Sequence, residues 1–239
     1  MLVQACLNGA RPHDYHPRLP VTPEALVADA AAVVRAGAAE IHLHVRDGEG
    51  RESLAPTAVE TTLAAVRAAV PGTLVGISTG EWIERDEDRR LAHIAAWRVL
   101  PDHASVNLAE FGAPAIVELL RRRGVAVEAG LASAADAERV VRLGLAELSL
   151  RMLVEIEAQD LGAALAEADA VLAVLAAAGV RKPILLHGFD GTVWPLVERA
   201  FSLGLSTRVG LEDCATLPDG TAAADNAELV RAAVRLRAQ

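Results

Sequence analysis

Glu40-Ile41-His42-Leu43-His44-Val45-Arg46-Asp47 alternates apolar and polar side chains, as expected of a β-strand that leaves a buried sheet at a polar end. Successive side chains point to opposite faces, so His42, His44 and Arg46 share one face. In a barrel this face points inward, where two imidazoles could hold one divalent cation. A lone histidine would more simply be a core residue or a solvated strand end. The His-x-His pair favours metal ligation.

The same unit recurs along the chain: a short apolar strand, a polar or Gly-rich loop, and an amphipathic helix that stops near Gly or Pro. We expect strands at 2–7, 40–47, 73–78, 104–108, 125–128, 146–152, 183–187 and 206–211. We expect helices at 23–35, 56–70, 86–97, 113–123, 133–143, 161–178, 193–203 and 224–237. Units in this order, without a linker, predict a parallel sheet with right-handed crossovers. The fold class is therefore α/β, a single (β/α)8 TIM barrel over residues 1–239. The alternative, a doubly wound open sheet, needs a Gly-rich phosphate turn that Asn8-Gly9-Ala10-Arg11 does not provide.

Composition narrows the function classes. Hydrophobic residues make up 52% and aromatic residues 3% of the chain, so the core is aliphatic, as in layered barrels. A net charge of −9 argues against a nucleic-acid partner, and the triplet 121–123 is too short a basic stretch to change this. Two cysteines, Cys6 and Cys214, form no disulfide framework, so we expect a reducing, cytoplasmic setting. We expect no signal peptide and no membrane anchor, because charges interrupt the apolar stretches.

Active sites of such barrels lie at the C-terminal ends of the strands. Polar residues collect at or just beyond the expected strand ends: Asn8, His44, Arg46, Asp47, Ser78, Thr79, Asn107, Glu110, Glu128, Arg151, His187, Glu212 and Asp213. On the last strand, Arg208, Gly210 and Glu212 share one face, so Glu212 can join the two histidines. Two imidazoles and one carboxylate leave the fourth position of a tetrahedral zinc open. Asp213 is equally well explained as a turn residue, and the cysteines are better explained as small buried residues than as ligands.

Several motifs together resemble the β-keto acid cleavage enzymes, the family of the 3-keto-5-aminohexanoate cleavage enzyme. They are Leu19-Pro20-Val21-Thr22-Pro23-Glu24, His42-Leu43-His44-Val45-Arg46-Asp47, Ser78-Thr79-Gly80, Arg208-Val209-Gly210-Leu211-Glu212-Asp213, Pro218-Asp219-Gly220 and Asn226-Ala227-Glu228-Leu229-Val230. The resemblance covers nearly the whole chain. It implies a zinc (β/α)8 enzyme that joins a β-keto acid to acetyl-CoA and yields acetoacetate and a new acyl-CoA.

The resemblance also implies residue roles. His42, His44 and Glu212 match the ligands of one Zn²⁺ per chain. Arg208 and Asp213 match a pair in which the arginine holds the aspartate that removes the α-proton of the substrate. The candidate substrate-binding residues are Ser78, Thr79, Asn107, Glu128, His187 and Arg46, with Glu128 near the position that reads the far end of the substrate. For His187, a substrate hydrogen bond is favoured over a role as fourth ligand.

Other functions and features stay open. The second hypothesis is a metal-dependent hydrolase, because these enzymes also carry His-x-His on a barrel strand. They normally have further histidines after the fifth and sixth strands, where this chain has Glu128 and Arg151. A non-catalytic zinc scaffold is third. Glu81, Glu110 and Glu128 would favour a cationic substrate tail, and Arg11, Arg46 and Arg151 an acidic one. The resemblance implies a homodimer or homotetramer.

Overall fold

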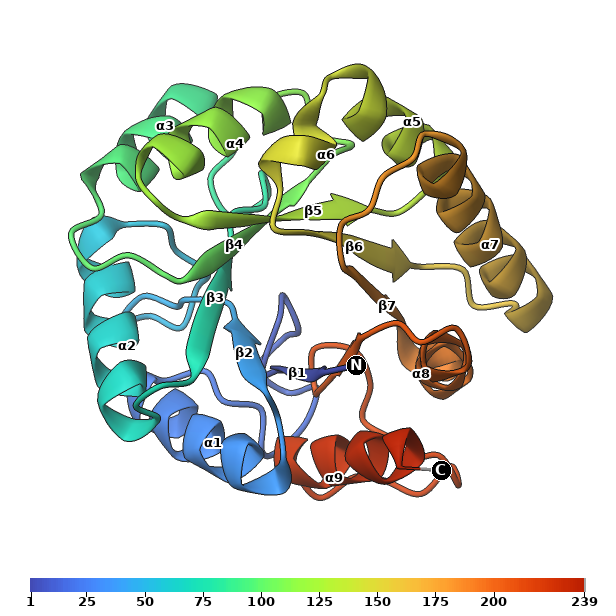
Figure 1. The fold of residues 1–239 in the computed structure, drawn as a ribbon. Coiled ribbons are helices and arrows are strands. Elements are labelled where there is room, and N and C mark those ends of the chain that lie inside the picture. The colour runs from blue at the N-terminus through green and yellow to red at the C-terminus, as the bar shows by residue number, and fades with distance from the viewer. Residues whose placement is uncertain (239) are drawn as a thin grey trace.

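A ring of parallel strands lies inside a ring of helices in the computed structural model, which describes residues 1–238 (Figure 1). The strands are β1 (Val3–Cys6), β2 (Glu40–Leu43), β3 (Leu74–Ser78), β4 (His103–Asn107), β5 (Ala126–Leu131), β6 (Arg151–Ile156), β7 (Ile184–Gly188) and β8 (Thr207–Val209). Each strand pairs in parallel with its neighbours in the order β8, β1, β2 and on to β7. Ser206, just before β8, closes the ring, because it accepts from Leu186 at 3.0 Å and donates to Ile184 at 3.1 Å. The predicted (β/α)8 barrel is confirmed.

The helices alternate with the strands and cover the outside of the barrel. They are α1 (Pro23–Ala36), α2 (Pro56–Ala69), α3 (Glu87–Ala96), α4 (Ala113–Arg122), α5 (Ala134–Arg142), α6 (Leu145–Leu148), α7 (Leu161–Ala177), the short 3₁₀ helix η1 (Asp190–Thr192), α8 (Val193–Ser202) and α9 (Asn226–Arg237). Local signals explain their ends. The hydroxyl of Thr22 caps α1 by accepting from Ala25 N–H, and Gly37, at φ 108°, ends it.

The sixth strand is the main error of the sequence-based prediction, which placed it at 146–152. Leu145–Leu148 is instead a helical turn after Gly144, and the strand begins at Arg151. The alternation of Leu148, Leu150 and Met152 suggested a strand, yet Leu150 is 42% exposed. The real strand continues to Ile156 because Leu153, Val154 and Ile156 are fully buried. Arg151 therefore lies at the start of its strand and not at its end.

Glu128 was also expected at a strand end, and this too is wrong. It is the third residue of β5, which continues to Leu131, and it pairs in register with Ser105 and Arg151. The Arg151 guanidinium contacts the carboxylates of Glu128, at 2.6 Å, and Glu40. All three are buried inside the barrel, below its mouth. Burial raises the pKa of Glu128, but His103 and Arg151 lower it more, to about 2, so the carboxylate is ionised.

Arg151→Met should therefore lower the free energy of unfolding by about 3–5 kcal/mol, because it leaves buried carboxylates without their cation. Urea denaturation of the metal-free protein measures this change. Arg199→Met is the matched control, because Arg199 pairs with Asp169 at 2.7 Å on the surface, where about 1 kcal/mol or less is expected. Equal losses in the two variants would contradict the structural role of Arg151.

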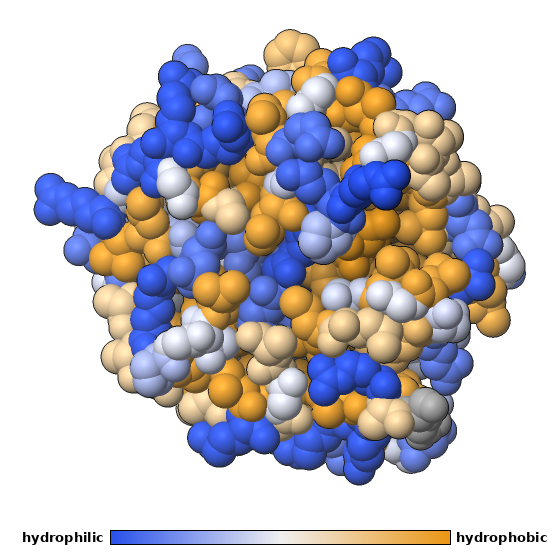
Figure 2. All heavy atoms as spheres, in the orientation of Figure 1, coloured by the Kyte–Doolittle hydropathy of each residue, from blue (hydrophilic) through white to orange (hydrophobic). Residues whose placement is uncertain are grey.

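Helix length and surface hydropathy can be compared with what a bilayer requires. Within residues 1–238, no helix combines the length and the apolar character needed to cross a bilayer. Figure 2 shows hydrophilic side chains near the centre of the face seen in Figure 1 and at its rim, with hydrophobic ones between them.

Candidate active site

His42 and His44 point into the mouth of the barrel, as the alternation predicted. His42 lies within β2 and His44 one residue beyond it, and both are buried. The Asn8 side chain fixes the backbone at His44: its Oδ1 accepts from His44 N–H at 2.8 Å and its Nδ2 donates to His44 O at 2.9 Å. Asn8 thus extends the pairing of β1 and β2 beyond their regular hydrogen bonds and fixes the backbone from which the His44 side chain projects.

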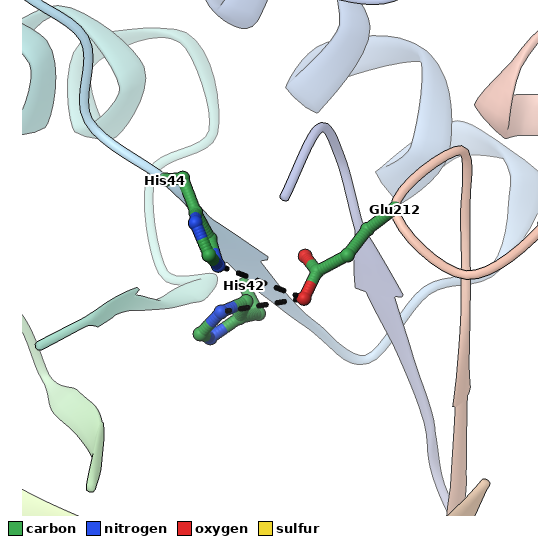
Figure 3. A group of neighbouring side chains, drawn as sticks. All are labelled: His42, His44 and Glu212. Atoms are coloured by element: carbon green, nitrogen blue, oxygen red, sulfur yellow. Dashed lines mark ion pairs between the residues drawn. The ribbon is translucent and has the colours of Figure 1, made fainter. Parts of the chain in front are cut away.

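Glu212, in the loop after β8, completes the group (Figure 3). Its Oε1 lies 4.0 Å from His42 Nε2 and 3.6 Å from His44 Nε2. One ligand atom from each residue lies within 4.8 Å of the others. Glu212 Oε2 is buried without a hydrogen-bond partner in the described chain. The Glu212 carboxylate therefore has one oxygen, Oε1, near the two imidazoles and a second, Oε2, without a partner within residues 1–238, so these three residues could hold a divalent metal.

The charges of the metal-free group differ from one ligand to the next. Burial lowers the pKa of His42 to about 3, although Glu212 raises it. Burial lowers the pKa of His44 as well, but Glu212 and Glu52 raise it more, to about 9. Burial raises the pKa of Glu212, and Arg208 and His44 lower it well below its usual value. At neutral pH, His42 is neutral, His44 is protonated and Glu212 is ionised.

Metal binding at pH 7 should therefore release about one proton per chain, because a ligating imidazole must be neutral. That proton comes from His44, whose pKa is about 9 in the free site. The release should fall towards zero as the pH rises through about 9. Calorimetric titration with Zn²⁺ in two buffers of different ionisation enthalpy measures the count. No proton release at pH 7 would contradict the charge assigned to His44.

Arg208 joins a cluster of carboxylates beside the metal ligands. Its Nη2 lies 2.6 Å from Glu212, 3.5 Å from Glu155 and 3.6 Å from Asp213. His187 lies between the last two, with Nδ1 3.3 Å from Asp213 Oδ1 and Nε2 3.5 Å from Glu155 Oε2. Burial lowers the pKa of Arg208, but Glu212, Asp213 and Glu155 contribute to a larger rise, so the guanidinium stays charged. Arg208 therefore supplies a permanent positive charge beside these carboxylates.

A cavity of about 760 Å³ opens above these groups at the C-terminal ends of the strands. Its wall includes His42, His44, Arg208 and Glu212, and also Glu155. The size is that of a small-molecule site. The arrangement can bind an anionic, chelating ligand at a metal, with a guanidinium and spare carboxylates in reach.

A family model described as "beta-keto acid cleavage enzyme" matches the sequence over residues 1–239. The chain belongs to this family. Two curated relatives of this chain are named 3-keto-5-aminohexanoate cleavage enzyme. The one from Acetoanaerobium sticklandii is 23% identical over 99% of this chain and 91% of its own length. The one from Fusobacterium nucleatum is 24% identical over 99% and 90%, respectively. Cleavage of a β-keto acid is the activity that this membership supports.

Solved structures similar to this chain support the fold. Apo ObcA superposes with a TM-score of 0.69 at 23% identity over 92% of this chain. The binary complex of ObcA with oxaloacetate gives 0.70, also at 23% identity over 92%. The chain spans only 61% and 63% of those two ObcA chains. This likeness shows the barrel architecture and nothing further.

The candidate substrate-binding residues fall into two groups. Ser78 and Asn107 line the cavity. Thr79, Arg46, Glu128 and His187 are not among the residues of its wall. Thr79 donates to the Ser105 carbonyl at 2.7 Å, and Arg46 donates to the carbonyls of Gly9, Arg11 and Gly50 at 2.8–3.1 Å. These bonds hold loops in place.

Two carboxylates near the ligands were missed by the sequence reasoning. Glu155 is the penultimate residue of β6, so a correct placement of that strand would have exposed it as a strand-end residue. Glu52 lies in the loop after β2, where its Oε1 is 2.5 Å from His44 Nδ1. The turn residues Asp47-Gly48-Glu49-Gly50 were the available signal for a hairpin that brings Glu52 back to the strand.

Proposed function

We propose that this protein cleaves a β-keto acid with acetyl-CoA as the acyl partner, using one Zn²⁺ held by His42, His44 and Glu212. The main support for this proposal is that these three potential ligands lie beside the Arg208 guanidinium, in a cavity at the strand ends. Two imidazoles and a carboxylate leave a coordination position for substrate. We also propose, from the sequence, a homodimer or homotetramer in the cytoplasm.

In this proposal, side chains of the protein carry out the proton transfer. A bound Zn²⁺ would supply electrophilic stabilisation to the ketone and carboxylate oxygens of the keto acid. Asp213 accepts a proton from the carbon between these groups. Both oxygens of Asp213 lack a hydrogen-bond partner in the described chain, so they can accept one. Arg208, 3.6 Å away, stabilises the negative charge of Asp213 and orients it.

The bonds then exchange in two steps. The deprotonated carbon attacks the carbonyl carbon of acetyl-CoA, and the CoA thiolate leaves. The thiolate attacks the original ketone carbon, and the bond from that carbon to the deprotonated carbon breaks. The carbanion that this cleavage releases takes back the proton that Asp213 had accepted. The products are a new acyl-CoA and acetoacetate, which carries the acetyl group and the carboxymethyl unit of the keto acid.

Glu155 is a second candidate for the base. Its carboxylate lines the cavity, whereas the Asp213 side chain has no exposed surface. We favour Asp213 because its place in the sequence matches that of the base in the family. The two candidates predict opposite effects of Asp213→Asn and Glu155→Gln on turnover.

The charge of the cavity wall favours a keto acid with a cationic or neutral tail. Asp136, Glu155, Glu157 and Asp190 line the cavity, in addition to Glu212. Arg11 also lines it, but its guanidinium pairs with Asp190 at 2.7 Å. Glu110, once expected near the tail, pairs with Arg90 at 2.7 Å and is not part of the wall. An anionic tail would face an excess of carboxylates.

The test is a screen of β-keto acids with cationic, neutral and anionic tails, with the Zn²⁺-loaded protein and acetyl-CoA. We expect acetoacetate from the cationic and neutral members, and little from the anionic ones of equal length. Each acid is also incubated without acetyl-CoA. Consumption of the acid at an undiminished rate in that control would move the assignment to a metal-dependent hydrolase.

A further inference from the structure

We propose that Glu52 is a positioning residue that holds the His44 imidazole with its Nε2 towards the metal, and that Trp82 of the cavity wall in turn holds Glu52. This inference rests on the proposed metal site and extends it to residues outside the ligand set. The Glu52 and His44 side chains are only 14% and 5% exposed, and Glu52 Oε1 lies 2.5 Å from His44 Nδ1.

The contact decides which nitrogen of His44 can bind a metal. An imidazole that donates from Nδ1 has its lone pair on Nε2, which is the atom that faces Glu212 at 3.6 Å. A carboxylate behind a ligating histidine fixes both the tautomer and the ring orientation. The second ligand lacks such a bond: His42 Nδ1 is 4.0 Å from Glu128 Oε2 and is unpartnered in the described chain. Glu52 therefore orients one ligand specifically.

A hairpin delivers Glu52 to this position. Residues 45–53 turn back on themselves, with Asp47 N–H donating to Arg51 O at 2.8 Å and Ser53 N–H donating to Val45 O at 2.9 Å. The Asp47 carboxylate accepts from the N–H groups of Glu49 and Arg51 at 2.9 and 3.0 Å. The turn is thus internally bonded without any help from the Glu52 side chain. Its closure leaves the Glu52 carboxylate free to bind elsewhere.

Trp82 fixes the other side of Glu52. Its indole N–H lies 3.2 and 3.1 Å from the two oxygens of the carboxylate, and its ring stacks on His44 with centroids 6.2 Å apart at 25°. A Cβ at Gly80 would come within 2.3 Å of the Trp82 ring, so glycine is needed there for this placement. Trp82 also lines the cavity. The cavity wall, Glu52 and His44 therefore form one connected unit.

The test measures the affinity of the protein for Zn²⁺ by competition with a chromophoric chelator at fixed pH. We expect Glu52→Ala to bind Zn²⁺ about 10–100-fold more weakly than the unchanged protein. Glu52→Gln keeps an acceptor of the same length, so it should recover part of this loss. Trp82→Phe, which keeps the ring but removes the N–H donor, should weaken binding by a smaller factor. Glu49→Ala is the matched control, since Glu49 is an exposed carboxylate of the same hairpin that pairs with Arg51.

The outcomes separate this inference from the proposed function. Affinities of Glu52→Ala and Glu52→Gln equal to those of Glu49→Ala and the unchanged protein would overturn the inference and leave the metal site standing. If Glu52→Ala does not fold, Glu52→Gln decides alone. An unchanged protein that binds no Zn²⁺ would overturn both. A graded loss of affinity in a protein that is inactive on every keto acid would support the inference and contradict only the proposed reaction.

Discussion

Asp213→Asn is expected to keep its bound Zn²⁺ and still lose about a hundredfold or more in acetoacetate formation, because an amide cannot accept the α-proton. Exchange of the α-proton of the keto acid with solvent deuterium should fall by the same factor. The neighbouring Glu212 binds the metal in this account, and Asp213 is not within the ligand group. The loss should therefore be one of turnover and not of metal content.

Glu155→Gln is the matched comparison for that variant. Both carboxylates lie 3.3–3.5 Å from His187 and 3.5–3.6 Å from Arg208, so each change removes one charge from the same cluster. We expect Glu155→Gln to lose far less turnover than Asp213→Asn. The reverse order, with α-proton exchange retained in Asp213→Asn and lost in Glu155→Gln, would make Glu155 the base.

Removal of a ligand imidazole should have the second largest effect. His42→Ala or His44→Ala leaves two of three protein ligands, so metal analysis after dialysis should find almost none of the about one Zn²⁺ per chain expected for the unchanged protein. Acetoacetate formation should disappear with the metal. Asp213→Asn, also buried but outside the ligand group, is the control that keeps its metal. Full metal content in both histidine variants would refute the assigned ligand set.

The sequence predicted well the parts of the site that depend on alternation within one strand. His42 and His44 share a face because they are two residues apart. Glu212 was also expected to share a strand face with Arg208, but β8 ends at Val209 and a turn after Gly210 brings Glu212 to the histidines. The helix ends were equally readable where a capping residue is present, as at Thr22 and Gly37.

Depth within the barrel was not readable in the same way. Glu128 and Arg151 point inward as expected, yet they lie below the mouth, because the register between neighbouring strands sets the depth of a residue. Alternation alone carries no register. The prediction for β6 failed for a related reason. The exposed Leu150 lies just before the strand, and it continued the alternating pattern in the N-terminal direction.

Glu52 illustrates a third limit. It follows His44 by eight residues and belongs to no strand or helix, so no periodicity connects the two. Its contact arises from the closure of a hairpin and from the Trp82 indole, which reaches it from the loop after β3. Such contacts between loops are set by tertiary packing, and a single sequence gives only the turn residues as a hint.

The central claim, that acetyl-CoA supplies the acyl group, is tested most directly with acetyl-CoA labelled with ¹³C in both acetyl carbons. The Zn²⁺-loaded protein is incubated with this compound and an unlabelled β-keto acid, and acetoacetate is examined by NMR. The account predicts label in the methyl and ketone carbons of acetoacetate and none in its carboxymethyl unit, together with an unlabelled new acyl-CoA. Unlabelled acetoacetate, or label recovered only as acetate, would contradict it.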